Sequence, residues 1–217
     1  MNKKFIETKK KEFAIIEYLK NELGKGKVSD IKINRTPLGD RIIIKTSKPG
    51  LIIGRRGEML QKITYILKNK FKLENPQIDI EEIDNMLYDA QSIADQLALS
   101  MERFGPLSFK IIAYKMLQRL IDAKVLGVEI VFGGKLPSQR TKTWRFSYGY
   151  LKKTGNYSTT LVKRATATAF TKPGTIGIKV LLIPPETKIP DNIEIEKGVI
   201  FEEIKEEKPE KKKSKKK

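Results

Sequence analysis

The sequence predicts an α+β protein that is divided into two domains. Segments with apolar residues at spacings of three and four, typical of amphipathic helices, alternate with short β-branched segments, typical of strands. Gly105 and Pro106 end one long helix-like segment and a second one follows directly, which indicates a domain boundary. With 217 residues, of which 39% are hydrophobic, the chain is long enough for one large or two small cores. We expect the first domain over residues 1–105 and the second over 106–185.

The first domain is expected to have the element order α-β-β-α-α-β. Its N-terminal helix carries Phe13, Ile16, Leu19 and Leu23 on one face and ends at Gly24. The next elements are strands over 28–35 and 41–47 with a turn at 37–40, a short helix over 49–53, a helix that stops before Asn75, and a strand over 77–83. A further helix, capped by Asp84 or Asn85, carries apolar residues at helical spacing: Leu87, Ala90, Ala94, Leu97, Met101 and Phe104.

The segment Gly54-Arg55-Arg56-Gly57 lies between the short helix and the helix after it. Because glycines lack side chains, a phosphodiester backbone can approach their amides closely, and the next helix presents unpaired N–H groups there. Arg55 and Arg56 add two positive charges. A G-x-x-G loop in this context is the minimal KH motif, which clamps about four nucleotides, and the preceding helix and strand give the type II order. The alternative is an ordinary glycine turn that opens a helix.

The second domain is expected to be a helix packed on a roughly four-stranded sheet. The helix runs from Phe109 to about Lys124, after a Ser108 cap, with Ile112, Met116 and Leu120 as its buried stripe. Strands are expected over 128–132, 141–151, 160–170 and 176–183. A second G-x-x-G match, over 174–177, follows a proline and precedes a strand, so we interpret it as a turn.

The second of these strands has four aromatic residues on one face. They are Trp144, Phe146, Tyr148 and Tyr150. Packing against the helix is favoured over a platform for base stacking, because the domain otherwise has few large side chains with which to build a core.

The charge of the chain indicates a phosphate-rich partner. Lys and Arg number 44 against 26 Asp and Glu, which gives a net charge of +18. Nucleic acid is the usual partner of so basic a chain. Residues 205–217 are a run rich in Lys and Glu, which we expect to be disordered, and a further short strand is possible over 198–201.

The composition disfavours most enzymes and metal proteins. The chain has no cysteine, so it lacks the thiolate ligands of zinc sites. It also has no histidine, which is the commonest metal ligand and the usual general base. We expect no catalytic residue, no metal and no cofactor. The only dense acidic group lies at the end of a strand and consists of Asp79, Glu81, Glu82 and Asp84. A solvated strand edge explains it more simply than a metal site. Without an apolar signal segment or membrane span, the chain is expected to be intracellular and soluble.

Two further groups of polar residues are candidates for RNA binding. Lys110, Lys115 and Arg119 lie on the polar side of the second domain's helix, where a solvated face is an equally good account. The loop before the second strand, together with that strand, carries a denser group that suits phosphate contact: Lys135, Gln139, Arg140, Lys142 and Arg145.

Three segments resemble a known family. Residues 134–142, Gly-Lys-Leu-Pro-Ser-Gln-Arg-Thr-Lys, are similar to the G-K-L-x-x-Q-R-x-K segment of the universal KH-domain protein family of the small ribosomal subunit, small-subunit ribosomal protein three, in its archaeal or eukaryotic form. Residues 171–180 resemble its last turn and strand, and residues 182–185 its exit from the domain.

This resemblance implies a structural constituent of the small subunit, ribosome-bound in the cytoplasm. Such proteins bind ribosomal RNA in the subunit head, contact neighbouring ribosomal proteins and line the channel where mRNA enters. In the family, basic residues early in the second domain's helix face the message. Here Lys110 is kept, but Ile111 and Tyr114 stand where bacterial relatives have basic residues.

Two other classes of function stay open. A free KH-domain regulator or assembly factor would be expected to carry a GTPase or catalytic domain, and no G-x-x-x-x-G-K-[ST] loop is present. A nuclease or DNA-repair lyase would need clustered carboxylates for a metal, or a lysine with a lowered pKa.

Overall fold

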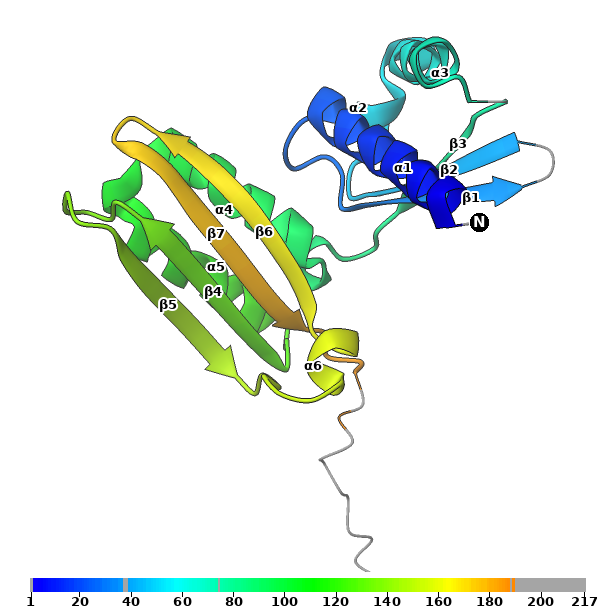
Figure 1. The fold of residues 1–217 in the computed structure, drawn as a ribbon. Helices are drawn as coiled ribbons and strands as arrows, with labels where there is room; N and C mark the ends of the chain where they lie inside the picture. Colours follow the sequence, from blue (N-terminus) through cyan, green and yellow to red (C-terminus); the bar gives the residue numbers. More distant parts are fainter. Residues whose placement is uncertain (1, 37–38, 74, 188, 190–217) are drawn as a thin grey trace, which may run out of the picture. The chain divides into compact units, whose positions relative to one another are not determined.

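A computed structural model describes residues 2–36, 39–73, 75–187 and 189 (Figure 1). Two of the expected features, the strand over 198–201 and the tail over 205–217, lie outside the described residues, as does part of the turn over 37–40. The elements described below all belong to the unit Met1–Thr187.

The first domain has the predicted order α-β-β-α-α-β. Its elements are α1 (Asn2–Leu23), β1 (Asp30–Thr36), β2 (Gly39–Thr46), α2 (Pro49–Ile53), the 3-10 turn η1 (Arg55–Gly57), α3 (Glu58–Phe71) and β3 (Gln77–Glu82). The sheet order is β1-β2-β3, in which β1 and β2 are antiparallel while β2 and β3 are parallel. Parallel neighbours need a crossover connection, and α2 and α3 provide it. The type II KH fold is therefore confirmed.

The buried face of α1 differs in part from the predicted one. Its buried residues include Ile15, Leu19 and Leu23, which pack with Ile42 and Leu67. Phe13, which was expected on this face, is 67% exposed, and Ile16 only borders the core. The reason is helical geometry: at about 100° per residue, Phe13 points about 200° away from Ile15.

The second domain has the predicted four-stranded sheet, which is antiparallel, but two helices cover one of its faces where one was expected. Its elements are η2 (Met86–Tyr88), α4 (Ala90–Phe104), η3 (Pro106–Ser108), α5 (Phe109–Asp122), β4 (Gly127–Gly134), β5 (Lys142–Gly149), α6 (Tyr157–Thr160), β6 (Lys163–Thr171) and β7 (Gly174–Ile183). The sheet order is β5-β4-β7-β6. Figure 1 shows α4 and α5 on the same side of this sheet. The short helix α6 had no counterpart in the sequence prediction.

Helix α4 starts later than expected and packs with the second sheet. Its N-cap is Asp89, whose carboxylate accepts a hydrogen bond from the Ser92 N–H, so neither Asp84 nor Asn85 is the cap. Its buried stripe, including Leu97 and Met101, lies in one core with β4, β6 and β7, while Phe104 is 64% exposed. This packing favours a domain boundary ahead of α4 over one at residue 105.

The aromatic residues of β5 are only partly in the core. The rings of Trp144 and Phe146 lie 5.4 and 6.3 Å from that of Phe109 on α5, as expected for packing on the helix. Tyr148 and Tyr150, which share their parity in the sequence, are 43% and 48% exposed. The core extends only to the part of β5 that α5 covers.

The N-cap of α4 gives a prediction for stability. Replacing Asp89 with Ala removes the acceptor for the Ser92 N–H and should lower the free energy of unfolding by about 1 kcal/mol. Urea denaturation followed by circular dichroism would measure it. The matched control is Asp84→Ala, which removes the same charge from an exposed position nearby and should change stability much less. Equal effects of the two substitutions would contradict the assigned cap.

Candidate nucleic-acid interface

The loop over residues 54–57 has an uncommon backbone conformation that only glycine adopts freely. Gly54, Arg56 and Gly57 all have positive φ angles, of 74, 51 and 77°. A Cβ at Gly54 would lie 3.1 Å from the Cβ of Met59, so a side chain there would also be crowded. Both glycines are therefore required by the turn itself.

This loop presents two arginines where α3 begins. Arg55 and Arg56 are exposed, and neither has an ion-pair partner among the described residues. No side chain caps the start of α3 at Gly57, so the first N–H groups of the helix lack a side-chain acceptor. The arrangement can hold a phosphate between two guanidinium groups and a positive helix end.

The acidic residues beside this domain's sheet have structural partners. The side chain of Arg41 on β2 pairs with Asp79 on β3, and Lys45 Nζ lies 3.2 Å from Glu81 Oε2. Among the described residues, no group of three or more Asp or Glu side chains is arranged to hold a metal ion. Two members of the acidic group, Asp79 and Glu81, therefore pair with cations of the neighbouring strand.

In the second domain, the β4–β5 loop exposes four of the predicted RNA-binding residues. These are Lys135, Gln139, Arg140 and Lys142. The loop is held to the domain by Leu136, which is fully buried in the core. Cations on a loop with such an anchor keep a fixed place on the surface.

Arg145, which was predicted together with this group, lies apart from it in the structure. Side chains alternate along β5, so Lys142, Trp144 and Phe146 share the helix-covered face, whereas Arg145 lies on the opposite face. There its Nε lies 2.5 Å from Glu129 Oε1, and Lys153 Nζ lies 2.9 Å from Glu129 Oε2. The sequence could have shown this separation, because the two positions differ in parity.

The three cations of α5 are exposed but lie on different sides of the helix. Lys115 and Arg119, four residues apart, are neighbours, whereas Lys110 points about 140° away from Lys115. The Nζ of Lys110 lies 4.9 Å from the centroid of the Trp144 ring. The structure therefore does not assemble these cations into one patch.

An exposed apolar stripe that runs from η3 onto α5 was missed in the sequence. Leu107, Ile111 and Tyr114 follow one another at spacings of four and three, and they are 78, 71 and 61% exposed. Phe104, at the end of α4, is also exposed. The spacing was visible in the sequence, where the buried stripe of this helix was predicted from Ile112, Met116 and Leu120, of which Met116 and Leu120 are buried.

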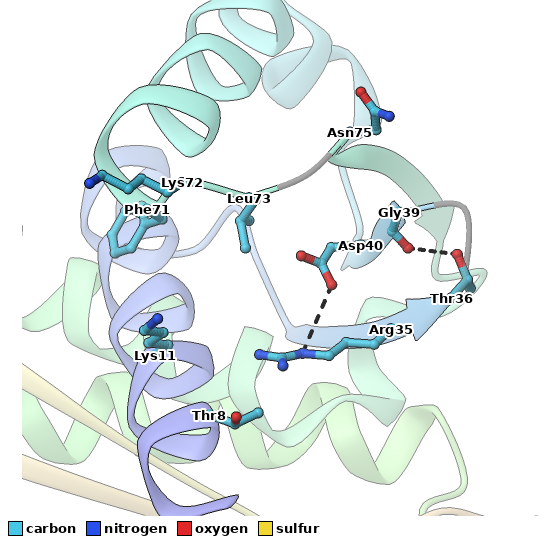
Figure 2. A pocket seen from close by; sticks show the side chains of 10 residues that line it. All are labelled: Thr8, Lys11, Arg35, Thr36, Gly39, Asp40, Phe71, Lys72, Leu73 and Asn75. Atoms are coloured by element: carbon cyan, nitrogen blue, oxygen red, sulfur yellow. Dashed lines mark hydrogen bonds and ion pairs between the residues drawn. The ribbon is translucent and has the colours of Figure 1, made fainter. Parts of the chain in front are cut away.

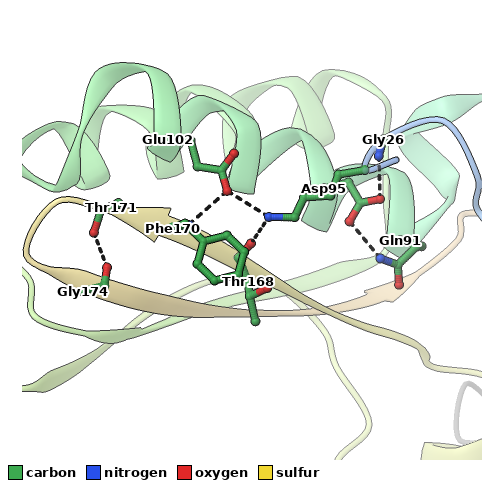
Figure 3. A network of polar contacts seen from close by, with 9 residues as sticks. Gly26, Gln91, Asp95, Glu102, Thr168, Phe170, Thr171 and Gly174 are labelled. Atoms are coloured by element: carbon green, nitrogen blue, oxygen red, sulfur yellow. Dashed lines mark hydrogen bonds and ion pairs between the residues drawn. The ribbon is translucent and has the colours of Figure 1, made fainter. Parts of the chain in front are cut away.

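A second missed feature is a polar network at the turn between α1 and β1 (Figure 3). Lys25 Nζ donates to Glu102 Oε1 at 2.9 Å and to the Thr168 carbonyl oxygen at 2.8 Å. Hydrogen bonds from the Phe170 N–H and from Lys25 hold the pKa of Glu102 below its ordinary value. Lys25 is therefore engaged within the protein and is a poor candidate for RNA contact.

Asp95 forms the other half of this network. Its Oδ2 accepts a hydrogen bond from the Gly26 N–H at 2.8 Å, and its Oδ1 accepts one from Gln91 Nε2 at 2.9 Å. Burial raises the pKa of Asp95 above its ordinary value, and both hydrogen bonds oppose that shift. Asp95 thereby joins the α1–β1 turn to α4.

A polar pocket of about 390 Å³ lies at the C-terminal end of α3, in the first domain (Figure 2). Three cations, Lys11, Arg35 and Lys72, line it, and Arg35 Nε lies 3.4 Å from Glu12 Oε1 and 3.9 Å from Asp40 Oδ1. Because α3 has 14 residues, the pocket lies about 20 Å along the helix from the loop over 54–57. None of the predicted site residues lines it.

The predicted site residues therefore lie on exposed surfaces outside this pocket. Such surfaces suit an extended polyanion better than a small ligand. Within the described part of the chain, none of the helices is long and apolar enough to cross a membrane.

Comparison with known proteins agrees with the two-domain architecture. The chain matches the family model of the KH domain over residues 14–86 and that of the ribosomal protein S3 C-terminal domain over residues 97–182. It is 37% identical to the small ribosomal subunit protein uS3 of Methanocaldococcus jannaschii over 203 residues, which cover 94% of this chain and 97% of that protein.

Two further relatives carry the same name. The protein of Methanosphaera stadtmanae is 36% identical, with 93% of this chain and 79% of that protein covered. The protein of Natronomonas pharaonis is 35% identical, with 89% of this chain and 63% of that protein covered. With both domains in the expected order and this similarity over most of its length, the chain belongs to the archaeal type of the small ribosomal subunit protein uS3 family.

Proposed function

We propose that this chain holds ribosomal RNA in the small subunit through two separate cationic surfaces. The first is the loop Gly54-Arg55-Arg56-Gly57, and the second is the β4–β5 loop with Lys135, Gln139, Arg140 and Lys142. The observation that carries the proposal is the pair of exposed arginines at the uncapped start of α3. Family membership makes the chain a structural, non-enzymatic constituent of the small subunit, with ribosomal RNA and other ribosomal proteins as partners.

The position of the chain within the subunit is a finer proposal. We place it in the head, at the channel where mRNA enters, ribosome-bound in the cytoplasm, with Lys110, Lys115 and Arg119 directed to RNA. Their exposure supports this role. The exposed stripe of Leu107, Ile111 and Tyr114 on the same helix suits contact with a neighbouring ribosomal protein better than separation of mRNA strands, because apolar side chains do not attract phosphates.

Sedimentation tests the assignment to the subunit. In a sucrose gradient of cell lysate, the chain should migrate with small subunits and stay with them through a high-salt wash, because a constituent is held by many contacts. A free KH-domain regulator would dissociate in the wash. A chain that remains at the top of the gradient would exclude the ribosomal role.

The first surface is tested by replacing Arg55 and Arg56 together with Asp. The glycines are retained, and Asp tolerates the positive φ angle at residue 56, so the melting temperature should change little. Affinity of the full chain for single-stranded RNA at low salt should fall at least tenfold, and the slope of log affinity against log salt should decrease by about 1.4. Fluorescence anisotropy would measure both. Binding equal to that of the unchanged protein would show that the loop is only a turn.

The second surface is tested by replacing Lys135, Arg140 and Lys142 together with Gln. The three side chains are exposed, so the protein should stay folded while its incorporation into small subunits decreases. A matched control replaces three exposed lysines elsewhere, Lys3, Lys10 and Lys124, with Gln and should incorporate normally. Incorporation can be measured by competition with the unchanged protein during subunit reconstitution. If both triple variants incorporate alike, the β4–β5 loop has no specific role.

A further inference from the structure

The sheet of the second domain has one face that no helix of its core covers. The core residues of its strands, such as Ile130, Phe146 and Val180, point toward α4 and α5, so the residues between them point to the opposite side. Figure 1 shows this side of the sheet free of α4 and α5. We call it the open face, and its central residues are Thr143, Arg145 and Ser147 on β5, Glu129, Val131 and Gly133 on β4, Gly177, Lys179 and Leu181 on β7, and Arg164, Thr166 and Thr168 on β6.

We propose that the open face is a third RNA surface, which binds the phosphate backbone. This inference rests on the proposed function, because it assumes that the chain binds ribosomal RNA. It adds a surface that neither the KH loop nor the β4–β5 loop includes.

Charge is the first support. Arg145, Lys153 and Lys179 reach the open face, and Arg164 shares it although its Nη2 already donates to the Ser158 carbonyl oxygen at 3.0 Å; with the carboxylate of Glu129, these five residues carry a net charge of +3. A polyanion is attracted to such a surface, and binding releases its counterions.

The strand register brings two of these cations into one row. Arg145 is paired with Val131, Val131 with Lys179, and Lys179 with Thr166. Because neighbouring strands lie about 4.8 Å apart, Arg145 and Lys179 are about 10 Å apart across the sheet. A backbone that crosses the strands can meet both.

Glu129 positions the cation at one end of this row. Its side chain is only 4% exposed and lies between Arg145 Nε and Lys153 Nζ, so a buried carboxylate restrains two cations on the face. Arg145 nevertheless keeps 62% of its side chain exposed, which leaves donors for a phosphate.

Between the cations, the open face carries small and polar residues. The next row consists of Thr143, Gly133, Gly177 and Thr168. A Cβ at Gly177 would meet only the Gly133 carbonyl oxygen, at 3.8 Å, so this part of the face is open to a close approach. A protein partner would be expected to find an apolar, charge-depleted centre here, but among the central residues only Val131 and Leu181 have apolar side chains, and both are half-buried. The exposed Phe170 lies toward the end of β6, with Lys25 Nζ 4.5 Å from its ring centroid.

The experiment places a negative charge on this face and compares it with a neutral side chain of the same size. Gly177→Glu and Gly177→Gln both fit the open space, and Gly177 does not have a positive φ angle, so each variant should fold. We expect Gly177→Glu to bind purified small-subunit ribosomal RNA about tenfold more weakly than Gly177→Gln, because the carboxylate repels phosphate. Circular dichroism would verify the fold of both.

A second substitution keeps the test valid if Gly177→Glu fails to fold. Lys179→Gln removes an exposed cation from the row and should lower the slope of log affinity against log salt by about 0.7 to 0.9. Lys124→Gln removes the same charge at the end of α5 and should leave the slope nearly unchanged.

The outcomes separate the two proposals. If the unchanged protein binds the RNA and the Gly177 and Lys179 variants bind it equally well, the open face is not an RNA surface, while the proposed function stands. If those variants bind RNA normally but fail to enter small subunits, a protein covers the face and the inference is wrong. If the unchanged protein does not bind the RNA, the proposed function fails and this inference fails with it.

Discussion

The packing of α4 on two sides is the constraint on which the arrangement of this protein depends. Its apolar side, with Ile93, Leu97 and Met101, completes the core of the second sheet. Its polar side binds the turn between α1 and β1, through Asp95 to the Gly26 N–H and through Glu102 to Lys25. One helix therefore contributes to the core of the second sheet through one set of side chains and holds the α1–β1 turn through another.

Carboxylates in this basic chain are used to hold cations in place. Glu102, Glu129 and Asp79 each pair with a Lys or Arg from another element. One of these acidic side chains is buried: Glu129 has 4% of its side chain exposed, against 27% for Glu102. A buried carboxylate needs such partners, because its desolvation is costly. The remaining cations stay outside, so the chain can keep an internal network and still present a strongly positive surface.

The sequence predicted the order of the elements well, because periodicity and Gly or Pro breaks are local signals. The type II order and the four-stranded sheet both followed from such signals. The errors arose where a tertiary contact decides between local alternatives. Phe13 and Ile15 both fit a helical stripe, and only the sheet beneath α1 selects Ile15. Asp84, Asn85 and Asp89 are all good caps, and the turn η2 selects Asp89.

In the candidate site, too, local features could be predicted from the sequence and tertiary contacts could not. Gly54 to Gly57 could be found because a glycine pair, two arginines and the flanking elements are adjacent in the sequence. The network of Lys25 could not be found, because Glu102 and Thr168 are 77 and 143 residues away from it. Arg145 was grouped with its sequence neighbours, although strand alternation puts it on the face opposite Lys142.

A positive φ angle alone does not identify the loop that we propose to bind RNA. Lys72, Asn75 and Lys124 share this conformation with Arg56. What distinguishes Arg56 is its context: glycines at residues 54 and 57 bracket it, a helix begins directly after it, and its charge has no ion-pair partner within the described residues. The aromatic rings of Trp144 and Phe146 are packed against Phe109, so of the aromatic residues within β5 only Tyr148 is substantially exposed, at 43%. If the chain binds RNA through the proposed surfaces, we expect recognition to depend mainly on the shape and charge of the RNA backbone, with selectivity coming from how the folded RNA places its phosphates against separate surfaces.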